Sequence, residues 1–207
     1  MRKYTPKGAL VALALICLGA APAAAADDVT GIWSAQIRTR GGLGAQMTFT
    51  AGQVTSTFGA LVDFKYEIDG NRIKMTSLSP HDPKPAAIMT QEFAIDADKM
   101  TVTMAGGQPQ LMTRVGAPYP DAHPIVGDWS FTHQTGQPAL TRYARSGVMQ
   151  LTVPFQTFKG PYRIENGAAR IEFEGLAPLT LKIKRDGDVL TTTDPKGKDI
   201  SFAKFEH

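Results

Sequence analysis

Methionine residues gather in the first half of the chain, where they could bind a soft apolar molecule. There are six between residues 47 and 112, namely Met47, Met75, Met89, Met100, Met104 and Met112. Most share the alternation of apolar neighbours such as Phe49 and Val102, which predicts that they face the interior of a sheet. Thioether side chains are flexible and polarizable, so they adapt to irregular apolar ligands. Ordinary core packing explains the same pattern and is the simpler interpretation.

His133 shares the alternation of Trp129 and Phe131, so we expect its ring to point inward. An inward histidine is usually a hydrogen-bonded core residue. Thioethers also bind Cu(I) or haem iron, but no histidine lies at ligand spacing from the methionines. We therefore predict no metal site and no cofactor, and we take His133 with the six methionines as the candidate ligand-binding residues.

Two further groups of charged residues have ordinary explanations. Arg142 and Arg145 lie on either side of Tyr143 and could bind an anion. Charged residues on a strand more often form a face exposed to solvent. The pairs Asp96 with Asp98 and Asp186 with Asp188 resemble the start of a calcium loop. Each lacks the later ligands that such a loop needs, and hairpin turns favour Asp at these places.

No set of residues for covalent catalysis stands out. Cys17 is the only cysteine, and no Gly-x-Ser-x-Gly motif is present. A site assembled from distant residues remains an alternative, for example an isomerase or hydrolase at a barrel mouth. The sequence favours a protein that is not an enzyme.

Short alternating segments separated by turn residues must position these side chains. Trp33, Ala35 and Ile37 alternate with polar residues, and Phe64, Tyr66 and Ile68 do the same before a turn at residues 69–71. We predict eight such strands before residue 115 and find no helical stripe. The expected fold class is therefore all-β.

A repeat organises these strands. Gly31-Ile32-Trp33 returns as Gly127-Asp128-Trp129, 96 positions later (127 minus 31), and Tyr66-Glu67-Ile68 returns as Tyr162-Arg163-Ile164. The Pro-rich segment 116–124 is typical of a linker. We predict two tandem antiparallel up-and-down barrels, at 27–115 and 125–207, since eight strands suffice to close each one. One wider barrel or sandwich built from both copies is the alternative.

The landmarks of each copy resemble the lipocalin-like (calycin) group of small antiparallel barrels. They are a Gly-x-Trp on the first strand, a Tyr-x-Ile before a turn midway, an Asp before an apolar strand, and a basic residue on the last strand. The resemblance implies that the Trp closes one end of its barrel under that basic residue. Arg114 would then lie across Trp33, and Lys204 across Trp129. A cation over an indole ring gains about 0.5–2 kcal/mol.

The first residues predict export. Residues 1–26 combine a basic start, an apolar stretch from Ala9 to Ala21 and Ala-x-Ala cleavage choices, which is typical of a cleaved signal peptide. Without Arg2, Lys3 and Lys7, 19 of the 22 Lys and Arg residues remain, which equals the 19 Asp and Glu residues. This neutral balance argues against nucleic acid as a partner. We expect a periplasmic or secreted protein without a transmembrane segment.

The function favoured by these observations is non-catalytic binding of a small hydrophobic ligand in a methionine-lined barrel. The alternative is a structural or protein-interaction module of the cell envelope that presents segments such as 79–86 or 155–161 to a protein partner. The sequence identifies neither the ligand nor the partner.

Overall fold

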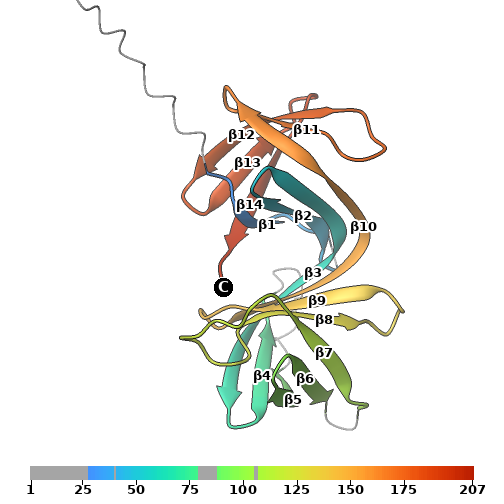
Figure 1. Cartoon of the computed structure of the whole chain (residues 1–207), viewed down its shortest axis with the longest axis vertical. Coiled ribbons are helices and arrows are strands. Elements are labelled where there is room, and N and C mark those ends of the chain that lie inside the picture. The colour runs from blue at the N-terminus through green and yellow to red at the C-terminus, as the bar shows by residue number, and fades with distance from the viewer. Residues whose placement is uncertain (1–27, 40, 79–87, 105–106) are drawn as a thin grey trace, which may run out of the picture.

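The computed structural model describes residues 28–39, 41–78, 88–104 and 107–207 (Figure 1). Every regular element in these ranges is a β-strand, and neighbouring strands are antiparallel, which confirms the predicted all-β antiparallel class. No helix among these residues is long and apolar enough to cross a membrane. The predicted signal peptide lies outside the described ranges, as does the segment 79–86.

The strands follow the chain with short turns between most of them. Their bounds are β1 (Gly31–Ala35), β2 (Leu43–Thr50), β3 (Gln53–Asp69), β4 (Arg72–Ser77), β5 (Ile88–Asp96), β6 (Lys99–Met104), β7 (Gln110–Val115), β8 (Gly127–Thr132), β9 (Pro138–Tyr143), β10 (Val148–Glu165), β11 (Ala168–Ile171), β12 (Leu179–Asp186), β13 (Val189–Thr193) and β14 (Asp199–Phe205).

Each strand pairs with the next one along the chain, and β14 pairs with β1, so the sheet closes on itself. A further pairing between β3 and β10 crosses the middle of this closed sheet. It divides the sheet into two rings of eight strands that share β3 and β10. Ring A consists of β1, β2, β11–β14, the first half of β3 and the second half of β10. Ring B consists of β4–β9 with the other halves, and the two rings form the two lobes in Figure 1.

Both rings therefore combine strands from the two predicted modules. Closure within 27–115 and within 125–207 would need β1 to meet β7 and β8 to meet β14. The observed closing pairs are β1 with β14 and β7 with β8. The arrangement is closer to the alternative of one sheet assembled from both copies. It arises because β3 and β10, with 17 and 18 residues, run from one ring into the other.

Gly59 explains why the sequence pattern predicts two short strands where the structure has the single long strand β3. The residues after Phe58 interrupt the apolar alternation and suggest a break between two strands, but the strand continues through them. A Cβ atom at Gly59 would lie 2.3 Å from the Val153 carbonyl oxygen of β10. Glycine is thus needed because two backbones approach closely, next to a bulge in β10 between Pro154 and Gln156.

The two Gly-x-Trp segments have matching geometry. Trp33 and Trp129 are fully buried, and each indole N–H donates to a carbonyl oxygen four residues earlier, at 2.7 Å. Gly31 and Gly127 have φ angles of 136° and 127°, a region open mainly to glycine.

The basic residues beside the two indole rings are the reverse of those that we expected. Arg114 lies 4.1 Å from the centre of the Trp129 ring, not of Trp33, and Lys204 stands opposite Trp33 in the β1–β14 register. The physical reason is the strand pairing, since β7 runs beside β8 and β14 beside β1. Each ring holds its own hydrophobic core around one of the two Trp residues.

Candidate ligand cavity

The interior of ring B contains a cavity of about 310 Å³. All eight strands of the ring, or the residues that directly follow them, contribute to its wall. The apolar lining residues are Phe64, Met75, Met89, Val102, Met112, Phe131, Met149 and Leu151. A concave site with mostly apolar walls and a few polar groups is the usual form of a small-molecule site.

Strand pairing brings the methionines of this wall together. Met75 stands opposite Met89 in the β4–β5 register, and Met149 stands opposite Phe64 on one side and Tyr143 on the other. Met100 stands opposite Met112 and is fully buried in the same core, but it is not part of the cavity wall. The result is a deformable apolar surface formed by several unbranched side chains.

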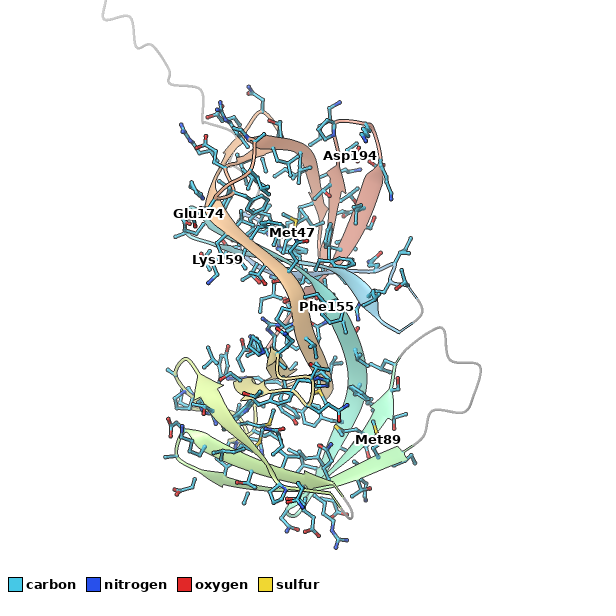
Figure 2. The ribbon with its side chains drawn as sticks, turned by 90° about the vertical axis from the view of Figure 1, so that its right-hand side faces the viewer. Met47, Met89, Phe155, Lys159, Glu174 and Asp194 are labelled. Carbon is cyan, nitrogen blue, oxygen red and sulfur yellow. The ribbon has the colours of Figure 1, made fainter. Side chains whose placement is uncertain are left out.

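The predicted site residues divide between the two rings. Met75, Met89, Met112 and His133 line the cavity. Met47 instead packs in the core of ring A, and Figure 2 shows Met47 and Met89 in different lobes. Met104 ends β6, where its backbone stands opposite Gln91, and its side chain is outside the described part of the structure.

Met149 was not among the predicted site residues, because it lies in the second repeat. The alternation of β10 correctly indicates an inward side chain at this position, but only the β3–β10 pairing shows which interior it enters. The same pairing separates Met47 from the other methionines. Local alternation does not predict which of the two rings a strand joins, so it could not place Met47 in ring A or Met149 in ring B.

His133 lines the cavity just after the end of β8 and is only partly buried. Its Nδ1 atom accepts from the backbone N–H of Thr135 at 3.3 Å and lies 2.9 Å from the Thr135 hydroxyl. An Nδ1 atom that accepts a hydrogen bond has no proton of its own. In the neutral ring the proton is then on Nε2, which serves as a donor.

Two buried hydroxyl groups belong to the same wall. Thr141 and Tyr143 stand on β9 and are 4% and 2% exposed. The Tyr143 ring meets the Tyr66 ring edge to face at 5.2 Å, and the Tyr66 hydroxyl donates to the Ala144 carbonyl oxygen at 2.7 Å. Burial raises the pKa of Tyr143 well above its usual value, so its hydroxyl stays protonated at neutral pH.

The cavity wall includes no Lys, Arg, Asp or Glu among the residues that the structure describes. Besides Thr141, Tyr143 and His133, its polar members are the four glutamines Gln91, Gln108, Gln110 and Gln134. Within the described ranges no cluster of three or more His, Cys, Asp or Glu side chains is placed to hold a metal ion.

Arg142, a candidate for anion binding, faces away from the cavity. It alternates with Thr141 and Tyr143 on β9, so its side chain lies on the outer face of ring B, where it is 7% exposed. Its Nη1 atom donates to Gln46 Oε1 at 3.1 Å and to Thr152 Oγ1 at 3.3 Å. Its Nε atom is 3.4 Å from Asp128 Oδ2. Burial lowers the pKa of Arg142, whereas Asp128 raises it.

Arg142 belongs to a buried polar layer between the outer faces of the two rings. Gln46 donates to Gln150 Oε1 at 2.6 Å, and Gln150 donates to Asp63 Oδ1 at 2.7 Å. Arg38 then pairs with Asp63 Oδ2 at 2.8 Å. These hydrogen bonds and ion pairs join residues of both rings, so the layer acts as a structural junction, although Arg142 Nε and Asp128 Oδ1 are buried without a hydrogen-bond partner among the described residues.

Another cavity, of about 360 Å³, opens beside this polar layer and includes Arg38 and Asp63 in its wall. Their charges are already paired with each other. The cavity of ring B differs because its wall is mainly apolar and has no Lys, Arg, Asp or Glu among the described residues. It is therefore the better candidate for ligand binding.

Comparison of the chain with family models, with curated proteins and with solved structures returned no match.

Proposed function

We propose that the protein is a non-catalytic, lipocalin-like binding protein that holds one small hydrophobic molecule inside ring B. The observation that carries this proposal is the interior cavity, to which all eight strands of the ring contribute. Its volume of about 310 Å³ is at the lower end of the range for small-molecule pockets. The two rings are, on this proposal, two lipocalin-like barrels with different roles.

Ring A serves, on this proposal, as the structural partner of ring B, with a core of bulky side chains. In its core Phe49 meets Tyr162 edge to face at 5.0 Å, and Ile171 and Leu190 are fully buried. The last strands of the two repeats, β7 and β14, offer a direct comparison, because Phe202 stands two residues before Lys204 as Met112 stands two residues before Arg114. A bulky aromatic ring thus occupies the place where ring B has a flexible thioether.

The leader supports export as part of this proposal. A basic start followed by a short apolar stretch and Ala-x-Ala choices is the pattern of secretory signals, so the working place of the protein is the periplasm or the exterior. Small hydrophobic molecules need a carrier in such aqueous compartments because their apolar surface is costly to expose.

The neutral fluorophore N-phenyl-1-naphthylamine tests the binding function. We expect saturable fluorescence enhancement at one site per chain. Met112→Phe should weaken binding at least about tenfold because the larger ring enters the cavity, whereas Met112→Leu, which nearly conserves volume, should change it by less than about threefold. Absence of saturable binding in the folded protein would reject the function.

A protein-interaction role is the second candidate, and two exposed aromatic residues favour it. Phe155 and Phe58 are 60% and 47% exposed where β3 and β10 cross, and Figure 2 shows Phe155 between the lobes. Exposed aromatic residues are enriched at protein interfaces. Photo-crosslinking from position 155, compared with position 111 on β7 as a control, tests for a partner. Equal labelling at both positions would count against this role.

A further inference from the structure

We infer that the ligand of ring B is an uncharged amphipathic molecule, with an apolar body and at least one neutral hydrogen-bonding group such as a hydroxyl, amide or carbonyl. This inference rests on the proposed binding function and narrows it. It excludes carboxylates, such as fatty acids, and amines as the preferred class.

The first observation is the composition of the wall. The 15 residues that line the cavity include no Lys, Arg, Asp or Glu within the described ranges. A charged headgroup placed inside would lose its hydration without gaining an opposite charge, which is strongly unfavourable. An apolar body, by contrast, is matched by the methionine and phenylalanine side chains.

The second observation is that the nearest buried charge cannot serve the cavity. Arg142 lies between Thr141 and Tyr143 in sequence, but its guanidinium is on the other face of β9. There it contacts Asp128, Gln46 and Thr152. Turning it inward would leave Asp128 without this cation and break bonds of the polar layer.

The third observation is a pair of hydroxyl-bearing residues on the cavity wall whose hydroxyls have no protein partner within the described ranges. Thr141 and Tyr143 both line it, and neither hydroxyl makes a hydrogen bond with any residue that the structure describes. Neither hydroxyl oxygen is among the buried side-chain atoms without a partner in the described ranges, so both are accessible from the cavity and can pair with water or with a polar ligand atom. A hydroxyl both donates and accepts, which suits a neutral group.

His133 is consistent with the same class. Its Nδ1 atom accepts from Thr135, so the ring at this edge of the cavity is held in a form with an acceptor at Nδ1 and a donor at Nε2. The four glutamines of the wall add neutral donors and acceptors.

Three ten-carbon probes test the inference on the unmodified protein. 1-Decanol, decanoate and decylammonium are compared at pH 7.5 by displacement of N-phenyl-1-naphthylamine. We expect decanol to displace the fluorophore at least about tenfold more effectively than either charged probe. If decanoate or decylammonium equals or exceeds decanol, the inference is overturned while the binding function stands. If the fluorophore itself shows no saturable binding, both fail.

Two nearly isosteric variants test the role of the hydroxyls. Tyr143→Phe and Thr141→Val should each weaken decanol binding about three- to tenfold, as expected for one hydrogen bond, and leave decane binding within about twofold. The matched controls in ring A are Tyr162→Phe and Thr192→Val. These two variants should change neither decanol binding nor decane binding. Near-ultraviolet circular dichroism verifies folding. Unchanged decanol affinity in both folded cavity variants would contradict the inference.

Discussion

The guanidinium of Arg114 lies 4.1 Å from the centre of the Trp129 ring, and this contact joins the last strand of the first repeat to the first strand of the second. The same side chain donates to the Val126 carbonyl oxygen at 3.0 Å and to the carbonyl oxygen of Pro124. Arg114 therefore fixes the segment that leads into β8 and covers the Trp129 indole ring.

Replacing Arg114 by Gln should lower the free energy of unfolding by about 2 kcal/mol, because a cation–π contact and hydrogen bonds to carbonyl oxygens are lost together. Urea titration followed by far-ultraviolet circular dichroism measures this. Arg170→Gln is the control, since Arg170 is 59% exposed and its ion pair with Glu172 is a surface pair worth little. Equal losses of unfolding free energy in the two variants would contradict the stabilising role of the Arg114 contacts.

A double-mutant cycle identifies which Trp residue Arg114 serves. Coupling of about 0.5–2 kcal/mol is expected between Arg114→Gln and Trp129→Phe, and almost none between Arg114→Gln and Trp33→Phe. The opposite result would restore the arrangement in which each predicted module closes on itself.

Linker cleavage should leave the molecule intact. Each ring contains strands from both sides of the segment 116–124, so neither fragment can complete a ring alone. With a protease site introduced at residues 117–118, we expect the cut protein to elute as one species of unchanged size and to separate only in denaturant. Two independently folded fragments would indicate barrels at 27–115 and 125–207.

Strand alternation correctly predicted which way several of these side chains point, because the direction of a side chain from a strand is a local property. Met75, Met89, Met112 and His133 all face inward, as their alternation indicated, but they share one interior although His133 was expected in the second barrel. The partner of each strand is not local. Met47 and Met149 occupy the opposite rings from those expected, since that choice depends on where β3 and β10 meet.

Glycine residues predicted the ends of strands correctly where they form turns and wrongly where they lie within a strand. Gly70 and Gly167 have positive φ angles in hairpins, as expected of glycine after Asp or Asn. Gly59 lies within a continuous strand, where its role is to permit contact with Val153. No local pattern distinguishes these two uses of glycine.

Gly59→Ala should be among the most damaging small substitutions in the chain. Its Cβ would lie 2.3 Å from Val153 O and 2.9 Å from Pro154 Cα, both backbone atoms that cannot move without disturbing the β3–β10 pairing. We expect a loss of about 3 kcal/mol or more in the free energy of unfolding. Gly70→Ala is the control, because nothing lies within 4 Å of its Cβ position.

The control still loses about 1 kcal/mol, since Gly70 has a φ angle of 59°. Urea unfolding midpoints compare the two variants. A Gly59→Ala protein no less stable than Gly70→Ala would show that β3 and β10 do not approach as closely as described.

The C-terminal end of the described chain predicts a pH dependence of stability. His207 Nε2 lies 3.3 Å from Asp128 Oδ1, and the ring packs near those of Tyr119 and Phe205. Burial, the largest cause, lowers the pKa of His207 below its usual 6.5. Asp128 and a backbone bond with Tyr143 oppose this effect, and Arg142 adds to it.

The direction in which stability changes with pH follows from proton uptake by the folded and unfolded states. With a lowered folded-state pKa, the unfolded chain protonates His207 first as the pH falls, so its contribution to stability is complete above pH 6.5 and is lost on acidification toward the folded-state pKa. His207→Gln removes this titration but leaves the carboxylates, which are common to both proteins. Urea midpoints between pH 7.5 and pH 5 should therefore fall more steeply for the unmodified protein. Parallel profiles would show that His207 titrates alike in the folded and unfolded states.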